Sequence, residues 1–253
     1  AALLITGGLL SSTLHLANRK NAIYALTRFK TSWLAREGLL AVVLYPLAAL
    51  HLAALHFGYP EVTPITLWLL VALGVAILFC TGMIYGCLRT IPRWNTWLTP
   101  AKYVLFGLMS GAVLLPAVLS LRPPEVGPIG KPMMAIFLLA LGLVLYLAYL
   151  LKHPRNTHTI NDALGFAQGN VRLLDAGHSH GTFLTNEFGF TLARDKARLL
   201  RWVSIICAFV VPLLLCWFTK AFWTASLICI AGLLVERWLF FAEAEHVVRL
   251  YHG

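Results

Sequence analysis

Two ionisable residues are spaced so that they could handle protons at one edge of a membrane. His15 lies at the end of one apolar run, and Glu37 lies at the start of the next. If the two runs form neighbouring membrane helices, both groups lie at the same depth near one face of the bilayer. An imidazole, which titrates near neutral pH, and a carboxylate could there accept protons from a small lipid-soluble donor.

Both residues also have a structural interpretation. His15 could be an interfacial histidine that hydrogen-bonds a neighbouring carbonyl. Glu37 follows Arg36 and opens a helix, where the helix dipole favours a carboxylate. An ionisable residue inside a membrane segment is costly to keep there, and it is therefore a functional hypothesis by default.

The composition of the 253-residue chain indicates a membrane protein. Hydrophobic residues make up 59% of the chain and charged residues 12%, with a mean hydropathy of +0.78, whereas soluble domains carry about 25% charged residues. About 20 apolar residues cross the hydrocarbon core, and their backbone must be helical because no water satisfies it there. We predict an all-α, polytopic transmembrane helical bundle that forms a single domain over residues 1–253. The seven expected spans are 1–17, 33–57, 65–88, 102–121, 133–151, 202–219 and 221–242.

The two least regular parts of the chain are its start and one long loop. The run 1–17 has no initiator Met, basic segment or cleavage site, which argues against a signal peptide. We expect it to be most of a spanning helix in a chain whose N-terminus lies further upstream. The loop 152–201 is long and polar, and such loops are usually functional or disordered. Its His178 and His180, beside Asp175, could bind a metal, but no fixed ligand spacing supports a site.

The cysteines and the other histidines do not favour a metal centre. None of the five cysteines forms a C-x-x-C pair, so we expect no iron–sulfur cluster or zinc in this chain and assign no metal ligands. His51 and His56 are five residues apart on one helix, so they diverge by about 140° and cannot clamp one haem. A haem held between His15 and His246 remains an alternative.

The charges are distributed unevenly between the two sides of this layout. Of the 20 Lys and Arg residues, 17 fall on one side and 3 on the other. The positive-inside rule makes the rich side cytoplasmic, although a basic surface could equally dock a partner subunit. The net charge of +10 fits anionic lipid headgroups or an acidic partner, and nothing suggests nucleic acid.

Two further groups of residues could form part of a site. Glu236 and Arg237 lie within the last apolar run, and Glu236 shares a helix face with Glu243. These charges could form a proton path or a docking surface, or they could end the helix by local ion pairing. Trp94 and Trp97 suit an interfacial aromatic belt, or the lip of a pocket for a ring-shaped ligand.

Four motifs together resemble the dimethyl sulfoxide reductase anchor-subunit family. The resemblance is spread over nearly the whole chain, and the combined order is more specific than any one motif. The loop 152–201 is larger than in compact members, which leaves the terminal acceptor and the docking of partners open. The motifs are Leu14-His15-Leu16, Ser32-Trp33-Leu34-Ala35-Arg36-Glu37-Gly38, Ile91-Pro92-Arg93-Trp94-Asn95-Thr96-Trp97-Leu98-Thr99-Pro100 and Glu236-Arg237-Trp238-Leu239-Phe240-Phe241.

The resemblance implies a multi-pass anchor in the bacterial cytoplasmic (inner) membrane, with eight spans in the intact chain. Its expected partners are an iron–sulfur subunit, a molybdopterin catalytic subunit and membrane lipid. Such an anchor binds menaquinol, carries no haem or iron–sulfur cluster, and passes electrons to the iron–sulfur subunit without holding the catalytic centre. The resemblance assigns His15 to the quinol-site histidine and Glu37 to the acidic residue beside it.

Our hypothesis is that this chain oxidises a membrane quinol as part of a larger enzyme. His15 and Glu37 would accept the protons, and we predict a pocket around them. The rival hypotheses are a polytopic transporter or channel, for which we find no internal repeat, a haem-bearing cytochrome anchor, and a bare scaffold. The residues predicted to shape the quinol pocket or contact the partner are Arg36, Arg93, Trp94, Glu236 and Arg237.

Overall fold

A computed structural model describes residues 6–7, 28–122, 130–152, 161 and 196–244 of the chain. Every regular element in these described ranges is a helix, and six of the helices are long and apolar enough to cross a membrane. The all-α, membrane-spanning prediction is thereby confirmed. The predicted first span, 1–17, lies outside the described residues apart from Thr6 and Gly7, as does most of the loop 152–201.

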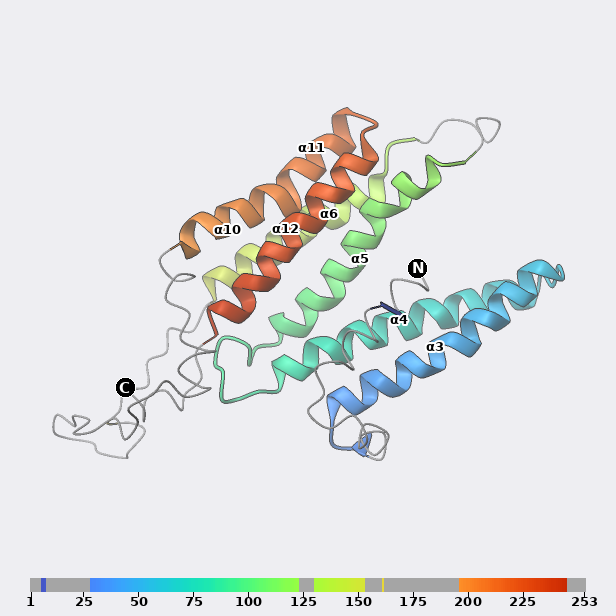
Figure 1. Cartoon of the computed structure of the whole chain (residues 1–253), viewed down its shortest axis with the longest axis horizontal. Coiled ribbons are helices and arrows are strands. Elements are labelled where there is room, and N and C mark those ends of the chain that lie inside the picture. The colour runs from blue at the N-terminus through green and yellow to red at the C-terminus, as the bar shows by residue number, and fades with distance from the viewer. Residues whose placement is uncertain (1–5, 8–27, 123–129, 153–160, 162–195, 245–253) are drawn as a thin grey trace. The chain divides into compact units, whose positions relative to one another are not determined.

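The chain divides into two compact units, Ala1–Ile84 and Tyr85–Gly253. The described spans of the first unit are α3 (Trp33–His56) and most of α4 (Val62–Gly86). The second unit contains the remaining spans, with α4 contributing only its last residues (Figure 1). These remaining spans are α5 (Leu98–Leu119), α6 (Met133–Leu151), a continuous segment formed by α10 (Ala197–Ile205), η4 (Ile206–Val210) and α11 (Val211–Phe218), and α12 (Phe222–Ala242).

In the first unit, α3 and α4 run antiparallel as a helical hairpin. Ser32 caps the start of α3, where its hydroxyl oxygen accepts a hydrogen bond from the amide of Ala35 at 3.3 Å. Gly58 ends the helix with φ of +71°, a left-handed conformation that favours glycine. The helix α4 begins at Val62, earlier than the predicted span, because Pro64 in a first turn needs no hydrogen-bond acceptor.

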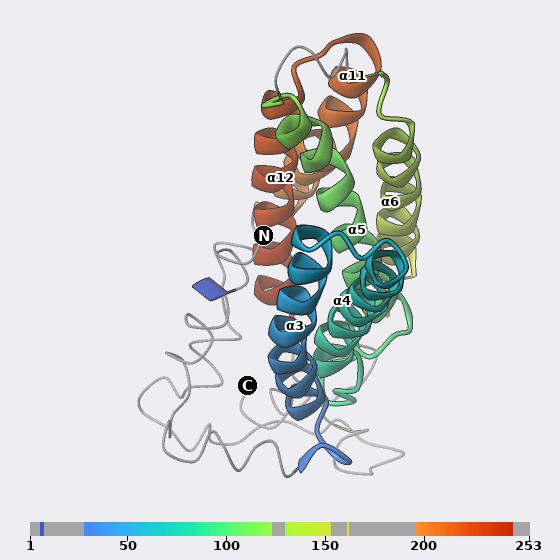
Figure 2. The same cartoon turned by 90° about the vertical axis from the view of Figure 1, so that its right-hand side faces the viewer.

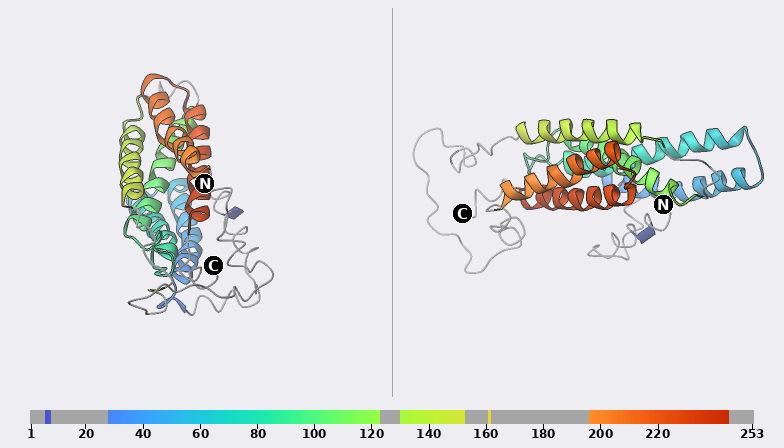
Figure 3. Two further views of the ribbon diagram at one scale, coloured as in Figure 1. Left: turned by 90° about the vertical axis from the view of Figure 1, so that its left-hand side faces the viewer. Right: turned by 90° about the horizontal axis from the view of Figure 1, so that it is seen from above.

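In the second unit, α5, α6, α11 and α12 form a bundle (Figure 2). Large apolar side chains make up its core. Gly142 of α6 allows α5 to approach closely, since a Cβ there would lie 2.8 Å from the sulfur of Met109. Figure 3, seen from above, shows α6 on one side of this bundle and α10 and α12 on the other. Many large apolar side chains point outward, as expected for helices that contact lipid.

A π-helical turn, η4, lies where α12 approaches the segment α10–η4–α11. Pro212 has no amide hydrogen and cannot donate to the carbonyl of Ala208, four residues earlier. The freed carbonyl instead accepts a hydrogen bond from the thiol of Cys229 on α12 at 3.4 Å. A Cβ on Gly232 would collide with the backbone at Cys207 and Ala208, so glycine permits the contact. The π-helical turn and Gly232 together allow α12 to pack closely against the backbone of the α10–η4–α11 segment.

Candidate functional site

Glu37 lies in the first turns of α3 and is half-buried. Its Oε1 accepts a hydrogen bond of 2.6 Å from the hydroxyl of Thr81 on α4. The same hydroxyl lies 2.9 Å from the carbonyl oxygen of Ile77, and one hydroxyl proton can serve only one of these acceptors at a time. Among the described residues, a hydroxyl and not a cation therefore holds this carboxylate.

Arg36, the neighbour of Glu37, holds the segment before α3 against the start of that helix. Its Nε donates to the carbonyl of Phe29 at 2.9 Å, and its Nη2 donates to the carbonyl of Lys30 at 2.7 Å. The guanidinium carbon lies 4.2 Å from the ring centroid of Trp33, in cation–π range. Two backbone oxygens and one ring thus engage most of this guanidinium.

The second unit contains a buried ion pair between two spans. Nζ of Lys102 on α5 lies 2.6 Å from Oε1 of Glu236 on α12, and the two side chains are 0% and 2% exposed. The other carboxylate oxygen of Glu236 accepts a bond of 2.9 Å from Nε of Arg237. Both oxygens of Glu236 are therefore paired with cations, as a carboxylate so deep in a membrane segment requires.

A second carboxylate, Glu243, is satisfied in the same way just beyond the end of α12. It forms ion pairs with Arg93, in the α4–α5 connection, and with Arg201 of α10. The hydroxyl of Tyr149 on α6 donates to the carbonyl of Arg93 at 3.2 Å. These bonds join α6, α10 and the end of α12 to the connection that leads directly into α5.

Aromatic rings surround these charges. Nζ of Lys102 lies 3.9 Å from the ring centroid of Tyr149 and 4.7 Å from that of Phe240. The indole of Trp94 stacks on Phe240, with centroids 5.1 Å apart, and donates to the Phe240 carbonyl at 2.9 Å. The guanidinium of Arg237 lies 4.0 Å from the ring of Tyr103. Rings provide cation–π contacts in a place where water would otherwise be needed.

The charge cluster of the second unit consists of four cations and two carboxylates. It therefore carries an excess of positive charge among the described residues. Two of its buried nitrogens, Nε of Arg93 and Nη1 of Arg237, have no hydrogen-bond acceptor within the described part of the chain. The members are Arg93, Lys102, Arg201, Glu236, Arg237 and Glu243.

Comparison with known proteins identifies the family of this chain. The family model for the "DMSO reductase anchor subunit (DmsC)" matches residues 1–243. The chain is also 30% identical, over 278 aligned positions, to a sulfite dehydrogenase subunit of Allochromatium vinosum, an alignment that covers all of this chain and 83% of that protein. The chain belongs to the DMSO reductase anchor-subunit family. No solved structure matches it.

Membership of the DMSO reductase anchor-subunit family makes the chain a multi-pass membrane anchor of a molybdoenzyme-type oxidoreductase complex. The structure of this anchor brings four predicted pocket residues into one charge and aromatic cluster. They are Arg93, Trp94, Glu236 and Arg237. Arg36 and Glu37 belong to the other compact unit, and His15 and His246 lie outside the described residues.

Lys102 is the site residue that sequence reasoning missed. The predicted span begins at Lys102, so that prediction groups this residue with the charges of the connection that precedes the span. The helix begins four residues earlier, at Leu98, with Pro100 in its first turn, where proline is well tolerated. Pro100 was the available signal in the sequence, because proline favours the first turn of a helix and so indicates a start near Leu98. A helix that starts there places Lys102 inside the membrane segment.

Proposed function

We propose that this anchor subunit oxidises a membrane quinol, menaquinol by the family resemblance, and passes the electrons to a partner iron–sulfur subunit. That partner would in turn pass the electrons to a molybdopterin catalytic subunit. The anchor would hold the complex at the bacterial cytoplasmic membrane. Oxidation of a quinol releases two electrons and two protons. The anchor must therefore hold the quinol headgroup close to the partner and must accept a proton from each hydroxyl.

The state of Glu37 is the observation that carries this proposal. Glu236 and Glu243 are each bonded to two cations, whereas Glu37 is bonded to a hydroxyl among the described residues. A carboxylate compensated by two cations is a poor proton acceptor, because the positive charges favour its ionised form. Within the described part of the chain, one oxygen of Glu37 is left for a substrate proton, and the residue lies in the first turns of a span.

In this proposal His15 hydrogen-bonds one quinol oxygen and takes its proton, and Glu37 takes the other. The hydroxyl of Thr81 can turn from Glu37 to the carbonyl of Ile77, so it can adjust as the carboxyl gains or loses a proton. In this proposal Arg93, Trp94, Glu236 and Arg237 have a role separate from the proton transfer. Their cluster joins α6, α10 and the end of α12 to the connection that leads into α5, and its excess positive charge suits an acidic surface of the iron–sulfur subunit.

The direction of electron flow depends on the catalytic partner. The family is named for a reductase, whereas the relative from Allochromatium vinosum is named for a sulfite dehydrogenase. The same two groups that accept protons from a quinol can return them to a quinone, so one site serves either direction. For this chain we propose quinol oxidation, and assays with quinol and with quinone as substrate separate the two.

The test compares two activities of the assembled complex in membranes. Quinol-driven turnover requires the anchor, whereas a reduced dye donates to the soluble subunits directly. We expect His15→Ala and Glu37→Gln to abolish quinol-driven turnover and stoichiometric quenching of a fluorescent quinol-site inhibitor, with dye-driven turnover unchanged. Glu61→Gln is the matched control, because Glu61 is exposed in the α3–α4 turn. Normal quinol turnover in both site variants would place the site elsewhere.

A further test addresses the haem-bearing alternative. An absorption spectrum of the purified complex, with and without dithionite, detects haem directly. Family membership favours the anchor over the transporter or channel hypotheses. A haem band that disappears in His15→Ala would replace the quinol-site role of His15 with an axial-ligand role.

A further inference from the structure

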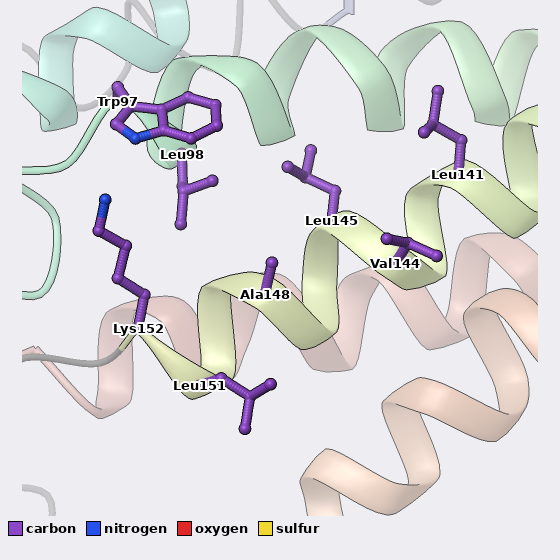
Figure 4. Close-up of a pocket in the computed structure, with 8 residues that line it drawn as sticks. All are labelled: Trp97, Leu98, Leu141, Val144, Leu145, Ala148, Leu151 and Lys152. Carbon is purple, nitrogen blue, oxygen red and sulfur yellow. The ribbon is translucent and has the colours of Figure 1, made fainter.

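A groove runs along the outside of the second unit, between the start of α5 and the second half of α6. Its volume is about 520 Å³. Figure 4 shows Leu141, Val144, Leu145 and Ala148 following one another along α6 as one wall. Trp97 and Lys152 lie together at one end, where α5 begins and α6 has just ended.

The length of this groove matches one leaflet of a bilayer. From Leu141 to Lys152 is 11 residues, or about 16 Å at 1.5 Å per residue. The hydrocarbon core is about 30 Å thick, so one leaflet is about 15 Å. The groove therefore extends from the headgroup level, at the end of α6, to about the middle of the membrane. An acyl chain of one leaflet has this reach.

The mouth of the groove is cationic. Nζ of Lys152 lies 5.6 Å from the ring centroid of Trp97, and Trp97 is 65% exposed. Among the described residues that line the groove, Lys152 is the one charged group, and none of them is a carboxylate. A lysine and a tryptophan at headgroup depth attract anionic lipid phosphates and anchor to the interface.

We propose that this groove is a binding site for an anionic phospholipid. The phosphate lies at Lys152 beside the indole of Trp97, and one acyl chain lies along Val144, Leu145 and Ala148 toward Leu141. A quinol fits the groove less well, since its headgroup needs hydrogen-bond acceptors and donors and the wall is apolar. The site concerns the lipid partner of the anchor and is independent of the proposed quinol chemistry.

The experiment uses the whole complex in phosphatidylcholine vesicles that contain a trace of spin-labelled phosphatidylglycerol or, in parallel, spin-labelled phosphatidylcholine. The fraction of label immobilised by the protein measures binding. We expect the wild type to immobilise phosphatidylglycerol about fivefold more strongly, the factor that one lysine contributes near a surface. Lys152→Gln removes this preference, whereas Arg89→Gln, an exposed cation of the α4–α5 connection, retains it.

A second variant tests the groove itself. Ala148→Trp fills the groove with an indole but keeps Lys152. We expect this variant to release the tightly held fraction of both labelled lipids. Equal immobilisation of the two lipids by the wild type, or an unchanged preference in Lys152→Gln, would overturn the proposal. Loss of the preference on adding inorganic phosphate would show a free-phosphate site instead. An increase in the KM for quinol in Ala148→Trp, with lipid binding unchanged, would assign the groove to the quinol tail.

Discussion

Lys102 and Glu236 form an ion pair of 2.6 Å between α5 and α12 with at most 2% of either side chain exposed. Taking two charges out of water costs several kcal/mol for each ion, and mutual attraction offsets this only when every other bond is also made. Here Arg237 takes the second oxygen of Glu236, and the ring of Tyr149 contacts the ammonium. The pair specifies how α5 and α12 meet.

Removing one partner of this pair should destabilise the anchor more than removing both. Lys102→Met leaves the buried Glu236 with Arg237 alone, and breaking a buried pair costs about 3–5 kcal/mol. The double variant Lys102→Met, Glu236→Leu replaces the pair with apolar contacts, and Arg237, whose side chain is 26% exposed, can reach solvent. Thermal unfolding of the four members of this cycle in one detergent measures the coupling. A double variant less stable than Lys102→Met would contradict it.

Most of the partners of these charges could not be predicted from the sequence. Glu236 and Glu243 are both buried, as their shared helix face suggests, and Arg237, the neighbour of Glu236, was open to prediction as a local partner. The other three cations lie 42, 134 and 150 residues away in the chain. Hydropathy shows that a charge is costly, and it does not show which distant group compensates it. The same holds for Trp94, which the motif placed at an interface and which the structure stacks on Phe240.

Gly232→Ala should disrupt the bundle of the second unit. A Cβ at this position would collide with the backbone of Cys207 and Ala208, which cannot move aside as a flexible side chain would. We expect a lower thermal midpoint and less assembled complex. Gly111→Ala on α5 is the matched control, because nothing lies within 4 Å of its Cβ. In a helix that exchange is favourable by up to about 1 kcal/mol, so a fall in both variants would contradict the steric explanation.

The fold class could be predicted because composition alone determines it. Long runs without charge must be helical in lipid, and the six spans in the described residues follow those runs. The π-helical turn Ile206–Val210 could not be predicted. The run is apolar whichever turn it adopts, and the local signal is only Pro212, which frees the carbonyl of Ala208. How that carbonyl is satisfied depends on Cys229 in another helix.

The cap of α3 should contribute to stability close to Glu37. Ser32→Ala removes the acceptor for the amide of Ala35, and loss of such a cap costs about 1 kcal/mol. Ser32→Asp keeps an acceptor and should restore the thermal midpoint. If Glu37 handles substrate protons, the KM for quinol should rise in Ser32→Ala and return toward normal in Ser32→Asp. Identical midpoints in all three proteins would show that the cap contributes nothing.

Thr81 should affect quinol turnover through its bond to Glu37. Thr81→Val keeps the shape of the side chain and removes the hydroxyl that donates to the carboxylate at 2.6 Å, so the carboxyl loses its orienting partner. We expect quinol-driven turnover to fall about tenfold, the effect of roughly 1.4 kcal/mol, with dye-driven turnover unchanged. Thr81→Ser keeps the hydroxyl and should restore the rate.

Thr66 provides the matched control for this prediction. Its hydroxyl lies 2.8 Å from Nδ1 of His51, also between α3 and α4 but near the other end of the hairpin. Thr66→Val therefore removes an equivalent interhelical bond without touching Glu37. If both valine variants slow quinol turnover equally, the hydroxyls act by holding the hairpin together. A loss confined to Thr81→Val, and reversed by serine, places the effect at the carboxylate, because Thr66→Val also removes an α3–α4 hydrogen bond but leaves Glu37 untouched.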